Sequence, residues 1–217
     1  MLSSESNITL SYPIWIRDFA EGSTSGKGSF MAHDYNEANA WAIINKGISQ
    51  FMLSTYLPGR NLACFTLFHN GKLIKYGVAQ RMEYVMGKVS ASGITGNTSK
   101  GKLLNDEKVF NVAYDAVTSI ARKTAEPMNG LVVTDLKEDA NGNLFVTEIN
   151  IRHVAFTSTF ASAGLNFSEY QMLILTGREH EIPECLTIPF SEDNVMLRDI
   201  DGLPIYLEHY QPIQQKS

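Results

Sequence analysis

The 217-residue sequence predicts an α+β fold built on antiparallel sheets, and three features support this class. Asn70-Gly71 and Asn141-Gly142 each lie between two β-rich runs, which is the pattern of a β-hairpin. The segment 105–123 has the apolar periodicity of a helix, with acidic residues in its first turn and basic residues in its last. We therefore expect antiparallel strands packed against a few helices.

Composition argues against several classes of protein. Hydrophobic residues make up 44% of the chain, and the formal net charge of -5 argues against a dedicated nucleic-acid binder. Cys64 and Cys185 stand in unrelated contexts and indicate neither a disulfide framework nor a zinc site, so a reducing, cytoplasmic setting is expected. No run of about 18 apolar residues occurs, and the polar start is no signal peptide, so we expect no membrane partner.

The N-terminal part predicts a small α+β lobe that contains a glycine-rich loop. The stretch EGSTSGKGSF intersperses three glycines with hydroxyl residues and Lys27, so its backbone N–H groups can cradle an anion. Its spacing is not that of a Walker A loop, and alone it also fits a flexible linker.

Trp41 is most simply a core residue. The lobe is expected to contain a strand over 12–19, a helix over 34–46 that Asp34 caps and Gly47 ends, and a strand over 50–57.

A break over 57–59, at Pro58-Gly59, is expected to be the hinge between two lobes, and an antiparallel meander follows it, with strands over 62–69 and 72–79. The segment 80–102 is predicted to be a mobile surface loop. An alternative is that Arg81, or Lys100 with Lys102, approaches an anionic ligand.

The hairpin over 131–150 is the most informative stretch. If Asn141-Gly142 forms a two-residue type I′ turn, Asp135 lies opposite Glu148, and Asn150 projects from the same face, as Leu144 and Val146 do. Opposed side chains are ~5 Å apart at Cβ, so the two carboxylates repel and we expect a positive group between them. Two carboxylates and an amide are hard oxygen ligands that suit magnesium. The alternative is an ordinary hairpin whose polar residues face water.

Asp135, Glu148, Asn150 and the following Arg152 resemble the metal-binding end of an ATP-grasp domain, most closely the carbamoyl-phosphate-synthetase-like branch. That resemblance implies two α+β lobes whose antiparallel sheets clasp a nucleotide. Residues 1–55 would be the lid subdomain, and residues 56–217 the C-terminal subdomain with a peripheral tail.

The resemblance also implies a nucleotide site. The glycine-rich loop would be the phosphate lid, and the adenine would bind main-chain groups at the hinge. Ser54, Thr55 and Asn61 stand where acidic residues are common in the family, which predicts weaker or altered nucleotide recognition. The nucleotide-binding residues so implied are Arg17, Gly22, Ser25, Gly26, Lys27, Gly28, Ser29, Tyr56 and Leu57.

The activity that the resemblance implies is that of an ATP- and magnesium-dependent carboxylate ligase, which joins an unidentified carboxylate to an amine through an acyl phosphate. Asp135, Glu148 and Asn150 would hold two magnesium ions, with manganese as an alternative, and Arg17 and Arg152 would be catalytic. His153 is interpreted as structural or solvent-facing rather than catalytic.

Complete enzymes of this family carry a preceding domain, so we expect a fragment, one half of a split enzyme, or a degenerate module. The alternative function is a non-catalytic nucleotide-binding module that acts through a partner chain. A structural domain with a surface cation site and no nucleotide is a third interpretation. The tail is expected to contain a helix over 166–176, then strands over 184–190 and 195–206 around a turn at Asp201-Gly202, and to cover an edge or contact a partner.

Overall fold

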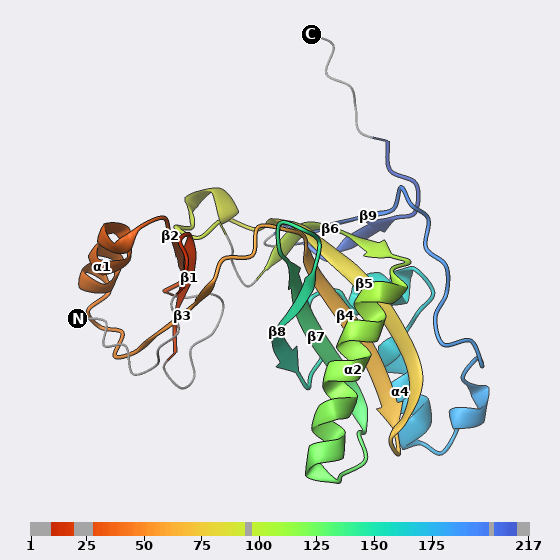
Figure 1. The fold of residues 1–217 in the computed structure, drawn as a ribbon. Coiled ribbons are helices and arrows are strands. Elements are labelled where there is room, and N and C mark those ends of the chain that lie inside the picture. Colours follow the sequence, from red (N-terminus) through yellow and green to blue (C-terminus); the bar gives the residue numbers. More distant parts are fainter. Residues whose placement is uncertain (1–9, 20–27, 94–96, 200–201, 212–217) are drawn as a thin grey trace. The chain divides into compact units, whose positions relative to one another are not determined.

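The computed structural model describes residues 10–19, 28–93, 97–199 and 202–211 (Figure 1). The chain divides into two compact units. Unit 1 comprises Met1–Pro58 and Tyr84–Asn97, and unit 2 comprises Gly59–Glu83 and Thr98–Ser217. Within the described residues, no helix combines the length and the hydrophobicity needed to cross a membrane.

Unit 1 is a three-stranded antiparallel sheet, in the order β2-β1-β3, with one helix packed on it. The side chain of Asp34 accepts a hydrogen bond from the Glu37 N–H, as the capping prediction requires, and the helix ends three residues before Gly47. Trp41 packs against the core and stacks on Phe30, so its prediction as a core residue is confirmed. The elements are β1 (Ile14–Asp18), β2 (Phe30–Ala32), α1 (Tyr35–Ile44), β3 (Phe51–Thr55) and the 3-10 turn η1 (Gly87–Val89).

Unit 2 is a seven-stranded sheet in the order β10-β9-β6-β5-β4-β7-β8. Its central strand β4 is buried along most of its length and pairs antiparallel with both β5 and β7. Asn70 and Gly71 both have positive φ and form the predicted two-residue turn between His69 and Lys72. The strands are β4 (Asn61–His69), β5 (Lys72–Tyr84), β6 (Thr98–Leu104), β7 (Gly130–Glu138), β8 (Leu144–Asn150), β9 (Val195–Leu197) and β10 (Ile205–Leu207).

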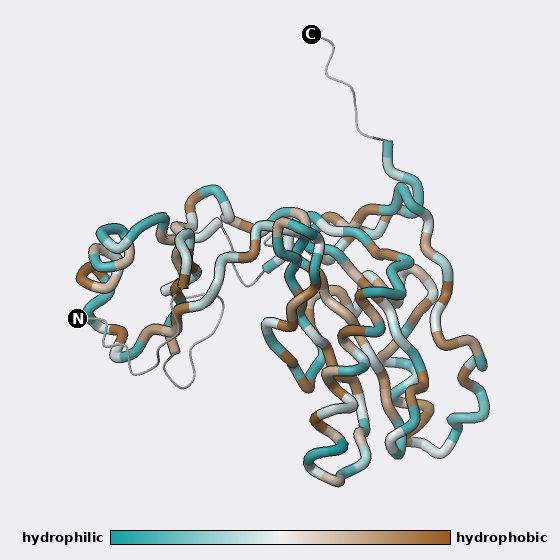
Figure 2. The backbone as a smooth tube through the Cα atoms, viewed as in Figure 1, coloured by the Kyte–Doolittle hydropathy of each residue, from teal (hydrophilic) through white to brown (hydrophobic). Residues whose placement is uncertain are grey.

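Helices cover the two faces of this sheet. The long helix α2 (Glu107–Thr124) packs Val109, Ala113 and Val117 against one face, and Figure 2 shows hydrophobic and hydrophilic residues interleaved along it. The helices α3 (Thr157–Ser162) and α4 (Phe167–Leu175) cover the other face.

Two glycines let α3 and the residue that caps it approach the sheet closely. A Cβ atom added at Gly77 of β5 would lie 2.5 Å from a ring atom of Phe160. At Gly101 of β6 it would lie 2.5 Å from a ring atom of Phe156 and 2.6 Å from the backbone oxygen of Gln80. Any larger residue would force the aromatic rings off the sheet.

Several segments differ from the expectation. The segment 80–102 was predicted to be a loop, but β5 continues to Tyr84, paired with β4 as far as Arg81 and lying beside β6 in the sheet, and β6 begins at Thr98. The short helix α3 was not predicted. The segment 184–190 forms no strand, whereas β9 and β10 extend the sheet beyond β6, as expected of a tail that covers an edge. In the predicted turn after β9, residue 201 lies outside the described residues.

Side-chain contacts hold the segment 183–190 in place, together with one backbone hydrogen bond in which Tyr76 of β5 donates to the Leu186 oxygen at 2.8 Å. The ammonium of the buried Lys75 donates to the backbone oxygens of Pro183 and Cys185 and lies 5.3 Å from the ring centroid of Tyr170. The side-chain amide of Asn105 makes two hydrogen bonds with the backbone of Phe190, one as donor and one as acceptor. These contacts satisfy backbone groups that no strand partner reaches.

Candidate functional site

The β7-β8 hairpin carries the acidic residues of the candidate site on one face. Asp135 is the cross-strand partner of Glu148, and Val133 is the partner of Asn150, as the sequence predicts. Cross-strand partners project from the same face, so all three polar side chains share it. This face also carries Leu131 and Val133, which belong to the core under α3 and α4.

The turn of this hairpin is not the predicted one. Asp139 pairs with Asn143 through backbone hydrogen bonding, which leaves a three-residue loop of Ala140, Asn141 and Gly142, with Gly142 at φ +77. The Asp139 carboxylate accepts from the Asn141 N–H and from the Asn143 N–H and side-chain amide. This side-chain capping favours a type I turn followed by a left-handed glycine over a two-residue turn.

A β-bulge restores the register that the longer loop shifts. Leu136 pairs with Val146 and Asp135 with Glu148, so Thr147 is an extra residue on β8, and its hydroxyl donates to the Asp135 backbone oxygen at 3.1 Å. The predicted pairing of Asp135 with Glu148 is therefore correct although the predicted turn is wrong. The predicted face of Leu144 and Val146 is also wrong, because these residues pair with the positions on the α2 side of β7.

Asp135 is the most constrained member of the site. Arg81 Nη2 lies 2.7 Å from Asp135 Oδ1, and the two side chains are 16% and 19% exposed. Burial raises the pKa of Asp135, and the nearby Glu148 raises it further, while the charges of Arg81 and Arg152 and the hydrogen bond from Arg81 lower it. The positive group expected beside the acidic pair is therefore Arg81, a residue of β5 in a segment that was predicted to be a loop.

The other residues of the hairpin site are more open to solvent. Glu148 is exposed and Asn150 is half-buried, and both belong to the edge strand β8. Across the described residues, no group of three or more His, Cys, Asp or Glu side chains is arranged to hold a metal ion. Two carboxylates and the Asn150 amide are thus the candidate ligands that this hairpin offers.

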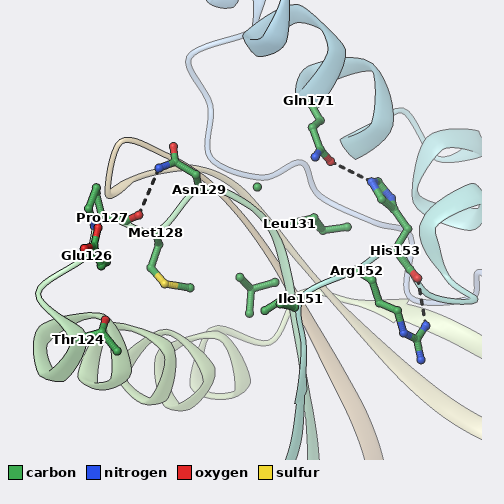
Figure 3. Close-up of a pocket in the computed structure, with 12 residues that line it drawn as sticks. Thr124, Glu126, Pro127, Met128, Asn129, Leu131, Ile151, Arg152, His153 and Gln171 are labelled. Carbon is green, nitrogen blue, oxygen red and sulfur yellow. Dashed lines mark hydrogen bonds between the residues drawn. The ribbon is translucent and has the colours of Figure 1, made fainter.

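A pocket of ≈ 390 Å³ lies at the other end of β7 (Figure 3). The loop between α2 and β7 forms one side of it, and Arg152, His153 and Gln171 form the other. Arg152 is exposed and donates to the backbone oxygen of His153 at 3.2 Å. The His153 ring lies 2.9 Å from the Gln171 amide oxygen and is exposed.

The nucleotide-binding candidates that the structure describes in unit 1 lie on β1, at the start of β2 and after β3. Ile14 and Ile16 are buried against α1, so alternation places Arg17 on the opposite face with Trp15, whose ring centroid is 6.3 Å from that of Tyr56. Leu57 follows Tyr56 in the chain. Gly22, Ser25, Gly26 and Lys27 lie outside the described residues.

The end of the glycine-rich stretch is fixed to the core of unit 1. Gly28 adopts φ +69, and a Cβ atom there would lie 2.5 Å from Ile48 Cδ1. Its carbonyl accepts a hydrogen bond from Trp41 Nε1 at 3.0 Å, and the next residue, Ser29, is buried. The loop therefore rejoins the sheet at a position that strongly favours glycine.

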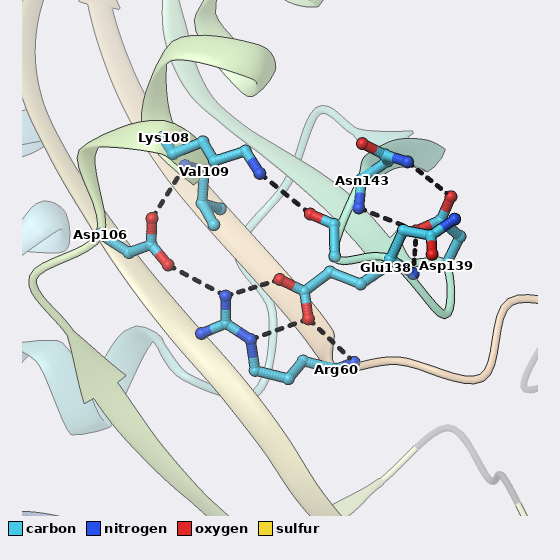
Figure 4. A network of polar contacts seen from close by, with 9 residues as sticks. Arg60, Asp106, Lys108, Val109, Glu138, Asp139 and Asn143 are labelled. Atoms are coloured by element: carbon cyan, nitrogen blue, oxygen red, sulfur yellow. Dashed lines mark hydrogen bonds and ion pairs between the residues drawn. The ribbon is translucent and has the colours of Figure 1, made fainter.

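A second polar cluster near the hairpin was not predicted (Figure 4). Arg60, just before β4, donates to the Glu138 carboxylate through Nε at 2.9 Å and Nη2 at 2.6 Å, and to Asp106 at 3.2 Å. The hydrogen bond from Arg60 lowers the pKa of Glu138. Lys108 donates to the Gly142 backbone oxygen, so α2 also contacts the loop of the hairpin. Spacing in the sequence gives no sign of this cluster, because its members are far apart in the chain.

The small α+β unit and the seven-stranded sheet with its acidic hairpin have the ATP-grasp fold, as the resemblance implied. The chain is similar to the biotin carboxylase domain of Hydrogenobacter thermophilus 2-oxoglutarate carboxylase, solved with MgADP, ADP and bicarbonate, at 18% identity and a TM-score of 0.60. It is similar to Staphylococcus aureus N5-carboxyaminoimidazole synthetase, solved with ADP, at 18% identity and a TM-score of 0.64. It is also similar to the L-amino acid ligase of Bacillus licheniformis, at 16% identity and a TM-score of 0.53.

These similarities cover most of this chain but only part of the other proteins. The alignments span 87%, 87% and 88% of this chain and 41%, 47% and 46% of the three solved chains, respectively. The chain therefore spans less than half the length of the structures it matches. No family model matches the sequence, and no curated protein does either.

Proposed function

We propose that this chain supplies the nucleotide- and metal-binding parts of an ATP- and magnesium-dependent carboxylate ligase of the carboxylate–amine type. The observation that carries the proposal is the shared face of Asp135, Glu148 and Asn150 within an ATP-grasp fold. Two of the similar structures were solved with ADP, one of them with magnesium, and a third is an amino acid ligase. A carbamoyl-phosphate-synthetase-like specificity and a cytoplasmic location are part of the proposal.

The residues of the hairpin fit a divalent cation. Asp135 and Glu148 are opposed in the ladder, and burial raises the pKa of Asp135, so the pair is stabilised by added positive charge. Carboxylate and amide oxygens are the ligands that magnesium prefers. Asp135, Glu148 and Asn150 would together hold two magnesium ions, and manganese would substitute.

Bound magnesium would neutralise charge on the nucleotide phosphates. In unit 1, Arg17 and the backbone N–H groups of the glycine-rich stretch, including those of Gly28 and Ser29, would bind the phosphates, while main-chain groups of Tyr56 and Leu57 would bind the base. Arg152 would orient the carboxylate that attacks the γ-phosphate. The resulting acyl phosphate would then be captured by an amine, so the protein contributes positioning and electrostatics rather than a covalent nucleophile.

In this scheme residues 1–55 act as the lid and residues 56–217 as the C-terminal subdomain, and a further domain or partner chain completes the enzyme. The alternative is a non-catalytic nucleotide-binding module that acts through a partner chain, and the departures at Ser54, Thr55 and Asn61 favour it.

Calorimetric titration of the chain with ATP, with and without magnesium, tests the proposal. We expect magnesium-dependent binding that Glu148→Ala abolishes and that Glu179→Ala, which removes an exposed glutamate from the turn after α4, leaves unchanged. Equal binding by the wild type and Glu148→Ala would show that the hairpin is not the metal site. Phosphate release with candidate carboxylates and amines would favour the ligase, whereas nucleotide binding without turnover, even with its partner chain present, would favour the alternative.

A further inference from the structure

The contact between Arg81 and Asp135 joins two strands that are not neighbours in the sheet. Arg81 is on β5 and Asp135 is on β7, with β4 between them. Asn61 of β4 is the cross-strand partner of Arg81, and Ala63, two residues further along β4, is the partner of Asp135, so the guanidinium reaches diagonally over the small Ala63 side chain to the carboxylate. This small residue of β4 therefore allows an arginine to reach over the sheet to the acidic hairpin.

Charge and burial explain why the arginine stays there. Asp135 faces Glu148 across the ladder, and both carboxylates favour a cation beside them. Arg81 contributes one positive charge at 2.7 Å from Asp135 Oδ1, in a position where both side chains are less than 20% exposed. Its second contact is long, 3.4 Å from Nη1 to the Leu62 backbone oxygen, so Asp135 is its principal partner.

We propose that Arg81 is the resident counter-cation of the acidic hairpin and that a divalent metal ion must displace it from Asp135 in order to bind. The inference rests on the proposed function, because it takes Asp135 as a metal ligand. A guanidinium has only hydrogen-bond donors and cannot itself bind a metal ion, so Arg81 competes for the carboxylate. Arg81 is thus a positioning residue that competes with the metal ion for Asp135 and weakens the metal affinity of the hairpin.

Displacement needs no movement of the sheet. Asp135 is held by strand pairing on both sides and by the Thr147 hydroxyl, which donates to its backbone oxygen. Arg81 is anchored by its backbone pairing with Asn61, so rotation of its long side chain is sufficient to release the carboxylate. The metal affinity of the hairpin therefore depends on how strongly the arginine holds Asp135.

Titration with Mn²⁺ alone, followed by electron paramagnetic resonance of the unbound ion at pH 8, tests the inference. We expect Arg81→Met to bind Mn²⁺ about tenfold more tightly than the wild type, because it removes the competing cation from a largely buried contact. Arg81→Lys keeps the positive charge but lacks the planar guanidinium, so its affinity for Mn²⁺ should be intermediate. Arg178→Met, which removes an exposed arginine paired with Glu181, is the matched control and should bind as the wild type does.

A second measurement does not depend on the stability of an Arg81 variant. In ¹⁵N-labelled wild-type protein, the Arg81 Nε–H resonance should shift on addition of Mg²⁺ toward its position in Asp135→Asn, and in Asp135→Asn it should not respond. An Arg81 resonance that ignores Mg²⁺ in a protein that binds it would overturn the inference.

The two hypotheses fail in different ways. If the wild type binds Mn²⁺ and Arg81→Met binds it equally or more weakly, Arg81 is a structural support of Asp135, and the proposed function stands without this inference. If the wild type, Arg81→Met and Arg81→Lys all fail to bind Mn²⁺, the hairpin is not a metal site, and both hypotheses are overturned.

Discussion

Replacing Arg60 with methionine tests whether the polar cluster in Figure 4 holds the hairpin to the rest of unit 2. Arg60 joins the start of β4 to Glu138 at the end of β7 and to Asp106, which caps α2. Methionine keeps most of the aliphatic stem and the backbone N–H, so the change removes mainly the guanidinium. The variant therefore isolates the charged contacts from the packing.

The expected loss of stability follows from the contacts of the Arg60 guanidinium. The guanidinium makes two hydrogen bonds to a carboxylate that is 11% exposed and one to Asp106, and hydrogen bonds to charged groups are worth about 1.5–3 kcal/mol each when buried. Because the Arg60 side chain is 41% exposed, solvent screens much of this interaction energy. We expect the free energy of unfolding to fall by about 2 kcal/mol at pH 7, with about 1 kcal/mol of coupling between Arg60 and Glu138.

Urea unfolding followed by far-ultraviolet circular dichroism measures this loss for the wild type, Arg60→Met, Glu138→Gln and the double variant. Both tryptophans, Trp15 and Trp41, belong to unit 1, so tryptophan fluorescence provides a separate probe of that unit. A coupling energy under about 0.5 kcal/mol would refute the reasoning.

The pH dependence gives a second check. The hydrogen bond from Arg60 lowers the pKa of Glu138 below its ordinary value of 4.5. A lowered carboxyl pKa contributes stability that is fully present above the unfolded pKa and is lost as pH falls through the folded one. The difference between the wild type and Arg60→Met should therefore be constant from pH 6 to 8 and shrink below about pH 4.

Three further changes test other features of unit 2. Gly101→Ala should cost at least about 2 kcal/mol in urea unfolding, because the new Cβ atom meets the Gln80 backbone oxygen, whereas Gly202→Ala has open space and should cost under about 0.5 kcal/mol. Lys75→Met should cost about 2 kcal/mol at pH 7, since the backbone oxygens of Pro183 and Cys185 lose the donor that the buried Lys75 side chain supplies. It should also abolish the rise in stability toward pH 10.5 that the lowered pKa of a buried lysine produces. Deletion of Ala140 should leave a two-residue turn and an unchanged pairing of β7 with β8. The Mn²⁺ affinity in a direct titration should therefore stay within about twofold of the wild-type value. A larger loss of affinity would contradict the β7-β8 register described above.

Local patterns predicted the long helix, the first hairpin and most strands of the fold, because turn chemistry and apolar periodicity are properties of neighbouring residues. They did not predict that β5 continues to Tyr84, since the polar stretch after Ala79 is a strand through its place in the sheet between β4 and β6. Likewise, the contact of Arg81 with Asp135 depends on strand order, which places β4 between two strands that are distant in sequence. The candidate ligands and the presence of a positive group beside them could be predicted, but not that this group is Arg81.

The acidic hairpin shows that one separation along the chain is compatible with two different ladders. A two-residue turn with a regular strand and a three-residue loop with a bulge use the same number of residues between Asp135 and Glu148, and both oppose these two side chains. Comparison of distant sequences should therefore rely on the interval between the carboxylates and allow the turn residues to vary. An alignment that required identical turns would miss relatives whose metal-binding faces are the same, and apolar residues near the turn would be assigned to the wrong side of the sheet.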